Sequence, residues 1–205
     1  MTTDATGTAV PEWRFDAGRT CLDLMATAGP PGPPGDMGPE PLAGAGRLGE
    51  WLLGAGLLPD GTPVGCVDGC WVDRFTALRG WIDQVVRAQL AGRGAEAALE
   101  RVNALASAPP PVVRAVRDGN GALVRALAAA PECGALLAAV ARDTVELLTD
   151  PAARGRLRQC QGVSCSRVYL DTSRGRRRRW CSSEVCGNRE RVARHRRRTA
   201  ALSRA

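Results

Sequence analysis

Apolar residues recur along much of the chain with the spacing of amphipathic helices. The clearest stretch is 71–91, where apolar side chains return mostly at three- and four-residue intervals. Shorter stretches with the same period predict further helices over 42–58, 95–106 and 131–148. The pattern therefore predicts a body that is mostly helical.

Turn-forming residues separate these segments. Loops rich in glycine and proline are predicted over 29–41 and 59–69, and the proline run 109–111 ends the helix before it. The sequence Asp-Gly-Asn-Gly at 118–121 is strong turn chemistry, which favours a β-hairpin over 112–129. A helix that restarts after this turn is the alternative.

The N-terminal region is less regular. Residues 1–12 are polar and are expected to be disordered. The segment 13–27 contains a glycine between two short apolar runs, which predicts a strand or hairpin that leads into the start of a helix. The fold class expected for the body is α+β, mostly helical with small β-hairpin elements.

Charge divides the chain near residue 150. The 205 residues carry 28 basic side chains, all of them arginine, and 21 acidic ones. Residues 1–150 hold 12 arginines and 18 acids, a net charge of −6, whereas residues 151–205 hold 16 arginines and 3 acids, a net charge of +13. The sequence therefore predicts an acidic body over 13–150 and a separate basic module over 151–205.

Composition excludes several classes of protein. Because the chain has no lysine, neither a Schiff-base lysine nor a Walker A nucleotide site is available, and His195 is the single histidine. We find no signal peptide and no apolar run long enough to cross a bilayer, so we expect a cytoplasmic protein without membrane contact. We expect no enzymatic activity; Asp16, Arg19 and Asp23 form the polar cluster on which an enzymatic alternative would rest.

The last four of the eight cysteines form two matched pairs. Four residues separate Cys160 from Cys165, fifteen residues follow, and Cys181 and Cys186 repeat the same spacing. Two cysteine pairs across a short insert are typical of a tetrahedral all-thiolate zinc site, so we predict one structural Zn²⁺ held by these four residues. A disulfide framework would require an oxidising compartment, which nothing in the sequence indicates.

The other cysteines carry a weaker signal. Cys66 and Cys70 lie in a glycine-rich turn, and a second metal site completed by Cys21 and Cys133 is conceivable. Buried or half-buried free cysteines that behave as small apolar residues are the preferred interpretation. His195 is expected at the surface or against a phosphate, because four thiolates already complete a tetrahedron.

The basic module is predicted to be a treble-clef-like four-cysteine zinc finger. A short strand over 156–160 leads into the first cysteine pair, a strand over 167–171 leaves it, and 176–181 is predicted to return as its partner strand. Ser182-Ser183-Glu184 then offers an N-cap and a first-turn acid for a helix that runs to about Ala201. A module with so few apolar side chains needs the metal in order to fold.

The final helix is predicted to have two faces. One carries Val185, Val192 and Thr199, which are expected to pack on the finger. The other face and the preceding segment carry arginines that are expected to contact nucleic acid, DNA in the first place, with an acidic protein as the alternative partner. These residues are Arg176, Arg177, Arg178, Arg179, Arg191, Arg194, Arg197 and Arg198. Asn188, Arg189 and Trp180 are expected to support the finger structurally.

Two motifs give the chain a family resemblance. Cys186-Gly187-Asn188-Arg189, preceded by Arg179-Trp180-Cys181-Ser182 and Val168-Tyr169-Leu170-Asp171, resembles the CGNR zinc finger over residues 155–200. Phe15-Asp16-Ala17-Gly18 and Cys21-Leu22-Asp23-Leu24 resemble the ABATE domain over residues 13–150. The sequence departs from the usual pattern at Met25-Ala26-Thr27, which lacks an asparagine, and at Tyr169, where phenylalanine is more usual.

The resemblance implies a function. Proteins with these two parts are described as candidate stress-induced transcription regulators of bacteria, which implies a zinc-containing protein whose finger binds DNA. The four paired cysteines would be the metal ligands, and the body would be a sensor or oligomerisation unit. A homodimer and an unknown small-molecule signal at the body are open partners. The alternative is a zinc-finger adaptor that binds an acidic protein or RNA.

Overall fold

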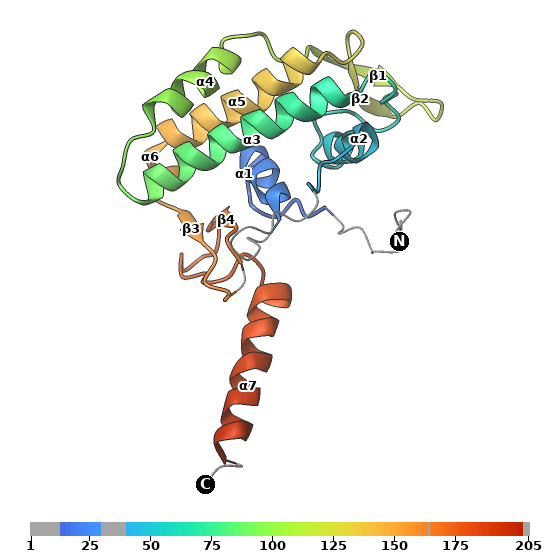
Figure 1. The fold of residues 1–205 in the computed structure, drawn as a ribbon. Coiled ribbons are helices and arrows are strands. Elements are labelled where there is room, and N and C mark those ends of the chain that lie inside the picture. The colour runs from blue at the N-terminus through green and yellow to red at the C-terminus, as the bar shows by residue number, and fades with distance from the viewer. Residues whose placement is uncertain (1–12, 30–39, 164, 203–205) are drawn as a thin grey trace.

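The computed structural model describes residues 13–29, 40–163 and 165–202, without the side chains of Arg198 and of residues 200–202. The N-terminal tail predicted to be disordered, and most of the predicted loop 29–41, lie outside these residues. Three helices pack against one another at the top of Figure 1: α3 (Gly69–Leu90), α4 (Glu96–Ala106) and α5 (Cys133–Thr149). They confirm the three helices predicted from periodicity in this part of the chain.

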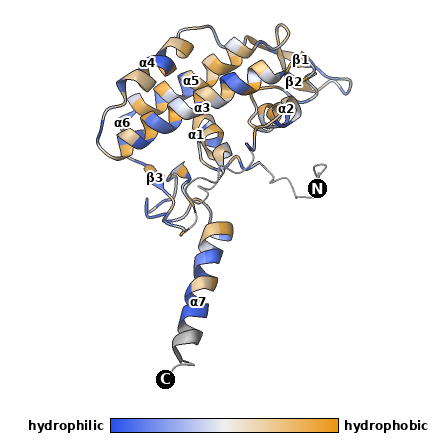
Figure 2. Cartoon of the chain, in the orientation of Figure 1, coloured by the Kyte–Doolittle hydropathy of each residue, from blue (hydrophilic) through white to orange (hydrophobic). Residues whose placement is uncertain are grey.

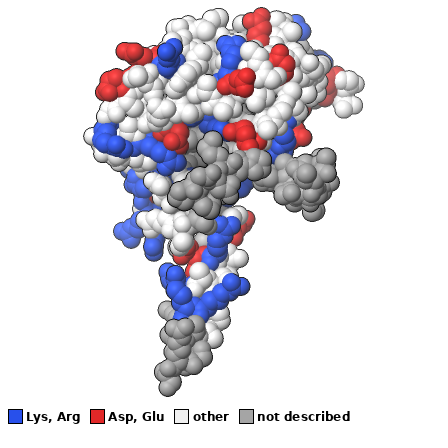
Figure 3. Space-filling view, viewed as in Figure 1, with Lys and Arg blue, Asp and Glu red and all other residues white. Residues whose placement is uncertain are grey.

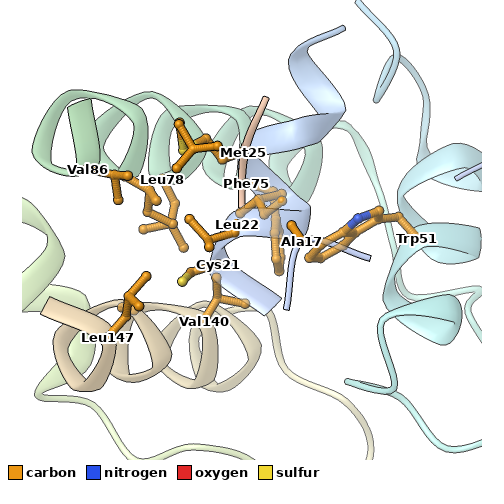
Figure 4. Packing of buried hydrophobic residues seen from close by; sticks show 14 of the residues in the cluster. Ala17, Cys21, Leu22, Met25, Trp51, Phe75, Leu78, Val86, Val140 and Leu147 are labelled. Carbon is orange, nitrogen blue, oxygen red and sulfur yellow. The ribbon is translucent and has the colours of Figure 1, made fainter. Parts of the chain in front are cut away.

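The core of the body forms where a short helix packs against α3 and α5. This helix, α1 (Thr20–Met25), continues as a 3-10 turn, η1 (Ala26–Ala28), and buries five of its six residues. Figure 4 shows Leu22 directed at Leu78 and Phe75 of α3 and Cys21 lying above α5. Helix α2 (Ala45–Gly54), which was predicted, adds Trp51 to the core with its ring 6.2 Å from that of Phe75.

The strand or hairpin predicted before α1 is wrong, because residues 13–19 form no strand in the structure. This segment is held instead by side chains of other elements. Asp143 of α5 accepts a hydrogen bond from the backbone N–H of Cys21 at 2.8 Å and pairs with Arg19 at 2.8 Å. The carboxylate therefore caps the N-terminus of α1 from a different helix, which no pattern within 13–27 could reveal.

The predicted β-hairpin is confirmed. β1 (Val113–Arg117) and β2 (Leu123–Leu127) pair antiparallel, with Val116 opposite Val124. Asp118 fixes the turn, since its Oδ1 accepts hydrogen bonds from the N–H groups of Asn120 and Ala122, both at 2.9 Å. The side-chain chemistry of the turn therefore decides this element.

We predict that Asp23→Asn stabilises the protein at neutral and higher pH. Asp23 is 8% exposed and its Oδ1 accepts the Ala17 N–H at 3.0 Å, and burial raises the pKa of its carboxyl from 3.8 to about 6. A carboxyl whose pKa is higher in the folded state binds its proton more tightly there, so the free energy of unfolding falls as pH rises from about 4 to about 6, by up to ~3 kcal/mol. Asparagine keeps the acceptor oxygen and carries no charge.

Urea unfolding of both proteins at pH 5 and pH 8 measures this effect. The variant should exceed the wild type by ~1–3 kcal/mol at pH 8, with a smaller margin at pH 5. Asp60→Asn, at an exposed loop position, is the control and should change neither value. The same margin at both pH values would contradict the prediction.

The C-terminal part, which we call the finger, begins after a one-turn helix, α6 (Pro151–Arg154). It contains strands β3 (Leu157–Gln159) and β4 (Val168–Leu170), a π-helical turn η2 (Ser183–Gly187) and helix α7 (Asn188–Leu202). Figure 1 shows β3 and β4 below the body and α7 extending away from both. The two strands and the final helix were predicted.

The predicted partner strand over 176–181 is wrong. β4 pairs antiparallel with β3, with Tyr169 opposite Arg158, and 176–181 forms no strand. The turn formed by the first cysteine pair brings β3 and β4 together, while Arg176 has φ of 49°, which ends any extended conformation there. The hairpin of the finger is therefore one segment earlier than predicted.

The finger is docked on the body through the segment before α1. The Leu170 N–H of β4 donates to the Ala17 carbonyl at 2.8 Å, and Arg167 pairs with Asp16 at 2.9 Å. Gly18 has φ of +90°, and a Cβ there would lie 3.1 Å from the Leu170 Cβ. A glycine is therefore required at this point of close approach. None of the helices described here is both long and apolar enough to span a bilayer.

Candidate metal centre and basic helix

The structure brings the four paired cysteines together. The Sγ atoms of Cys160, Cys165, Cys181 and Cys186 all lie within 4.8 Å of one another, and no disulfide joins them. The separations are 3.8 Å from Cys165 to Cys181 and 3.5 Å from Cys181 to Cys186. A tetrahedron with Zn–S bonds of about 2.3 Å has S···S edges of roughly 3.8 Å. The donor set therefore fits one tetrahedral zinc ion.

The surroundings of the sulfurs favour a bound cation. Burial, together with the neighbouring sulfurs, raises the pKa of Cys186 to about 11 and also raises the pKa of Cys181. Four thiolates crowded in this way would repel one another without a central positive charge. Zinc supplies that charge when bound, so uptake of the metal is coupled to loss of the thiol protons.

Local turns hold each pair of ligands. The Cys165 N–H donates to the Gly162 carbonyl at 3.0 Å, which closes the turn between the first pair, and the Cys181 N–H donates to the Cys160 sulfur at 3.3 Å. Ser182 caps η2 as predicted, because its Oγ accepts the Val185 N–H at 3.1 Å. η2 then presents Cys186 to the other three sulfurs.

Gly187 and Trp180 explain part of the motif around the second cysteine pair. Gly187 is buried, and a Cβ there would lie 3.4 Å from a ring carbon of the half-buried Trp180, so a larger residue would have to displace the indole. The Gly187 N–H donates to the Ser182 carbonyl at 2.9 Å. Trp180 therefore packs against the turn that carries the fourth ligand.

Helix α7 carries arginines with little shielding. Arg191, Arg194 and Arg197 are exposed, and Figure 3 shows basic atoms along this helix while the body mixes both signs of charge. Arg198 belongs to α7, but its side chain is outside the described residues. Glu190, one of two acids near the start of the helix, accepts the Val163 N–H at 3.2 Å and so ties α7 to the first cysteine turn.

The prediction that a valine stripe of the last helix packs on the finger is wrong. Val185 is 42% and Val192 is 44% exposed, and Thr199 is exposed further along. The final helix is not continuous from 183, because the π-helical turn η2 changes its phase, and α7 then points away from the finger (Figure 1). Figure 2 shows isolated apolar patches on the otherwise hydrophilic α7.

The family model ABATE, described as "Putative stress-induced transcription regulator", matches residues 18–151. The chain belongs to the ABATE family. A second model, the CGNR zinc finger, matches residues 156–199 of this ABATE protein. Both matches confirm the resemblance, and with the sulfur geometry they support a single structural zinc ion. No curated protein matches the chain.

The arginines before the second cysteine pair differ from one another. Arg176 and Arg177 are exposed, whereas Arg179 donates to Gln161 at 2.7 Å. The guanidinium of Arg178 is engaged inside the finger: it donates to the carbonyls of Trp180 and Cys181 and lies 4.8 Å from the Tyr169 ring centre. Arg176, Arg177 and Arg179 are all exposed, whereas Arg178 is half-buried and helps to hold the finger.

Asp171 is an important residue that sequence reasoning missed. It is fully buried, its Oδ1 accepts two hydrogen bonds from Ser173, and its Oδ2 accepts the Arg178 N–H at 3.0 Å. Burial would raise the pKa of Asp171, but these hydrogen bonds outweigh it and lower the pKa. Tyr169 adds a bond from its hydroxyl to the Arg178 carbonyl at 2.6 Å. The available signal was an isolated acid in a segment rich in arginine.

The remaining predicted positions are placed as follows. Asn188 and Arg189 are exposed at the start of α7, and their structural role stays a prediction. Cys21 and Cys133 are buried as expected, but Cys66 and Cys70 are exposed, so the expectation of burial is wrong for this pair. Their glycine-rich turn lies at the surface before α3. Among the described residues, the four finger cysteines are the group of three or more potential ligands that lies close enough to hold an ion.

Proposed function

We propose that this ABATE protein is a zinc-dependent, DNA-binding transcription regulator of bacteria. In this proposal the finger binds DNA through α7 and the segment before it, and the body acts as a sensor or oligomerisation unit. The observation that carries the proposal is a free-standing helix lined with exposed arginines, next to a metal centre that fixes its first turn. Neither family match is to an enzyme.

The dimensions of α7 suit the proposed contact. Its 15 residues extend for about 22 Å, and the major groove of B-DNA, about 12 Å wide, accepts one α-helix. Arginine guanidinium groups bind phosphates with two parallel hydrogen bonds, and the chain offers no other long basic side chain. The finger also carries exposed Arg176 and Arg177, which add further phosphate-binding groups to the proposed interface.

Mobility-shift assays with genomic fragments across a salt series test the proposal. If about five arginines contact phosphates, the logarithm of affinity falls with the logarithm of salt concentration at a slope of roughly −4 to −5. Affinity should then drop by about 250- to 1,000-fold between 50 and 200 mM salt. Absent binding by the zinc-loaded protein, or binding that salt does not weaken, would reject the proposal.

A pull-down with and without nuclease separates DNA from the alternative partners. Capture that survives nuclease treatment would indicate an acidic protein, and selective competition by RNA would indicate an RNA adaptor. The proposal expects capture to be lost after treatment with DNase and retained after treatment with RNase.

A further inference from the structure

A cavity of about 350 Å³ lies where the finger meets the body. The body lines it with Trp13, Asp23, Ala26 and Trp51, among others, and the finger lines it with residues around the metal ligands Cys165 and Cys186. Sites for small molecules commonly lie at such junctions and range from about 300 to 1,000 Å³. This cavity is at the lower end, the size of a metabolite.

The walls of the cavity favour a flat aromatic group. The half-buried Trp13 supplies an indole ring, Trp51 borders the cavity although it is 1% exposed, and Ala26, Pro41 and Val185 add small apolar surfaces. The Arg47 guanidinium lies 4.1 Å from the centre of the Trp13 ring and fixes that wall from a neighbouring helix. Aromatic rings pack well against indoles in stacked or edge arrangements.

Three guanidinium groups of the cavity offer hydrogen-bond donors to an acidic group. Arg14, Arg167 and Arg189 line the cavity, and Asp23 is the acidic side chain among its described lining residues. Arg14 and Arg167 share Asp16, which lies outside the lining, so one carboxylate holds both of these guanidinium groups in place. Asp23 is 8% exposed and burial raises its pKa to about 6, so it is ionised at neutral pH and the carboxylate of a ligand would lie on the arginine side of the cavity.

We propose that this cavity binds a small aromatic carboxylic acid. Its ring would pack against the Trp13 indole, and its carboxylate would face Arg14, Arg167 and Arg189. Because the walls come from both parts of the chain, the acid would brace the finger against the body beside the Leu170–Ala17 hydrogen bond. This inference rests on the proposed function and adds to it a class of small-molecule effector. Binding of the acid to the cavity requires no DNA.

Calorimetric titration of the zinc-loaded full chain with 2-naphthoate tests the site. We expect saturable binding of one molecule per chain, at least 10-fold weaker binding of the neutral 2-naphthamide, and at least 10-fold weaker binding of naphthoate by Ala26→Phe and by Arg189→Gln. Ala97→Phe and Arg101→Gln, at exposed positions of α4, are the matched controls and should bind as the wild type does. Circular dichroism and zinc content establish that each variant is folded.

Three results would overturn the inference. They are the absence of saturable naphthoate binding up to about 10 mM, equal affinity for the amide, and unchanged affinity in both cavity variants. Hydrogen exchange tests whether the bound acid holds the finger against the body. Backbone amides of residues 165–170 should exchange more slowly with naphthoate bound. Unchanged exchange would reject the bridging of finger and body. The titration contains no nucleic acid, so its failure is distinct from failure of the proposed DNA binding.

Discussion

Cys181→Ser is expected to remove zinc from the protein and to unfold the finger while the body stays helical. Cys181 lies at the centre of the cluster, with its sulfur close to those of Cys165 and Cys186 and its N–H bonded to the Cys160 sulfur. A serine hydroxyl does not become an anion at neutral pH and cannot replace a thiolate on zinc. Structural zinc contributes about 10–16 kcal/mol of apparent binding energy, which is folding energy for a module this small.

Elemental analysis and circular dichroism measure the two parts of this prediction. Zinc content should fall from about one ion per chain to near zero, and the helical signal of α3, α4 and α5 should remain. Cys66→Ser, at an exposed position outside the cluster, is the matched control and should keep its zinc. Unchanged zinc content in Cys181→Ser would contradict the ligand set.

Replacing Arg191, Arg194 and Arg197 together by glutamine is expected to weaken DNA binding by ~100-fold. A net contribution of about 1 kcal/mol from each lost phosphate contact gives this factor. The salt slope should also become shallower by about three units, because each phosphate contact contributes about one unit. The three side chains are exposed on α7, so the variant should fold and bind zinc as the wild type does.

A matched triple variant separates specific contacts from total charge. Arg93, Arg101 and Arg114 are exposed on the body, and their joint replacement by glutamine changes the net charge by the same amount. The affinity and the salt slope of this control should stay close to those of the wild type. Equal losses in both triple variants would show that the overall positive charge, and not α7, drives binding.

Local patterns were sufficient to predict much of the structure. The long helices follow from apolar periodicity, the body hairpin follows from the turn at 118–121, and the metal cluster follows from the spacing of the four cysteines. Each of these features depends on residues close together in the sequence or on one repeated chemical group. The local sequence is therefore sufficient to predict these helices, this hairpin and this cluster.

Contacts between distant segments explain what could not be predicted. The carboxylate that caps α1 belongs to Asp143, more than one hundred residues away, and β4 pairs with β3 because the first cysteine turn brings the two together. The direction of α7 depends on the π-helical turn before it, which no apolar period reveals. Local sequence patterns suggest candidate strands and candidate buried faces of helices, but contacts with distant segments decide which of them form.

The docking of β4 against residues 17 and 18 limits how this protein can recombine in evolution. A finger of this kind moved to another body would lose the carbonyl that receives its Leu170 amide, the carboxylate that pairs with Arg167 and the glycine that allows close approach. A functional chimera would have to inherit the short segment 14–18 along with the finger, although about 140 residues separate them in the gene product. The N-terminal segment and the finger are therefore expected to change together.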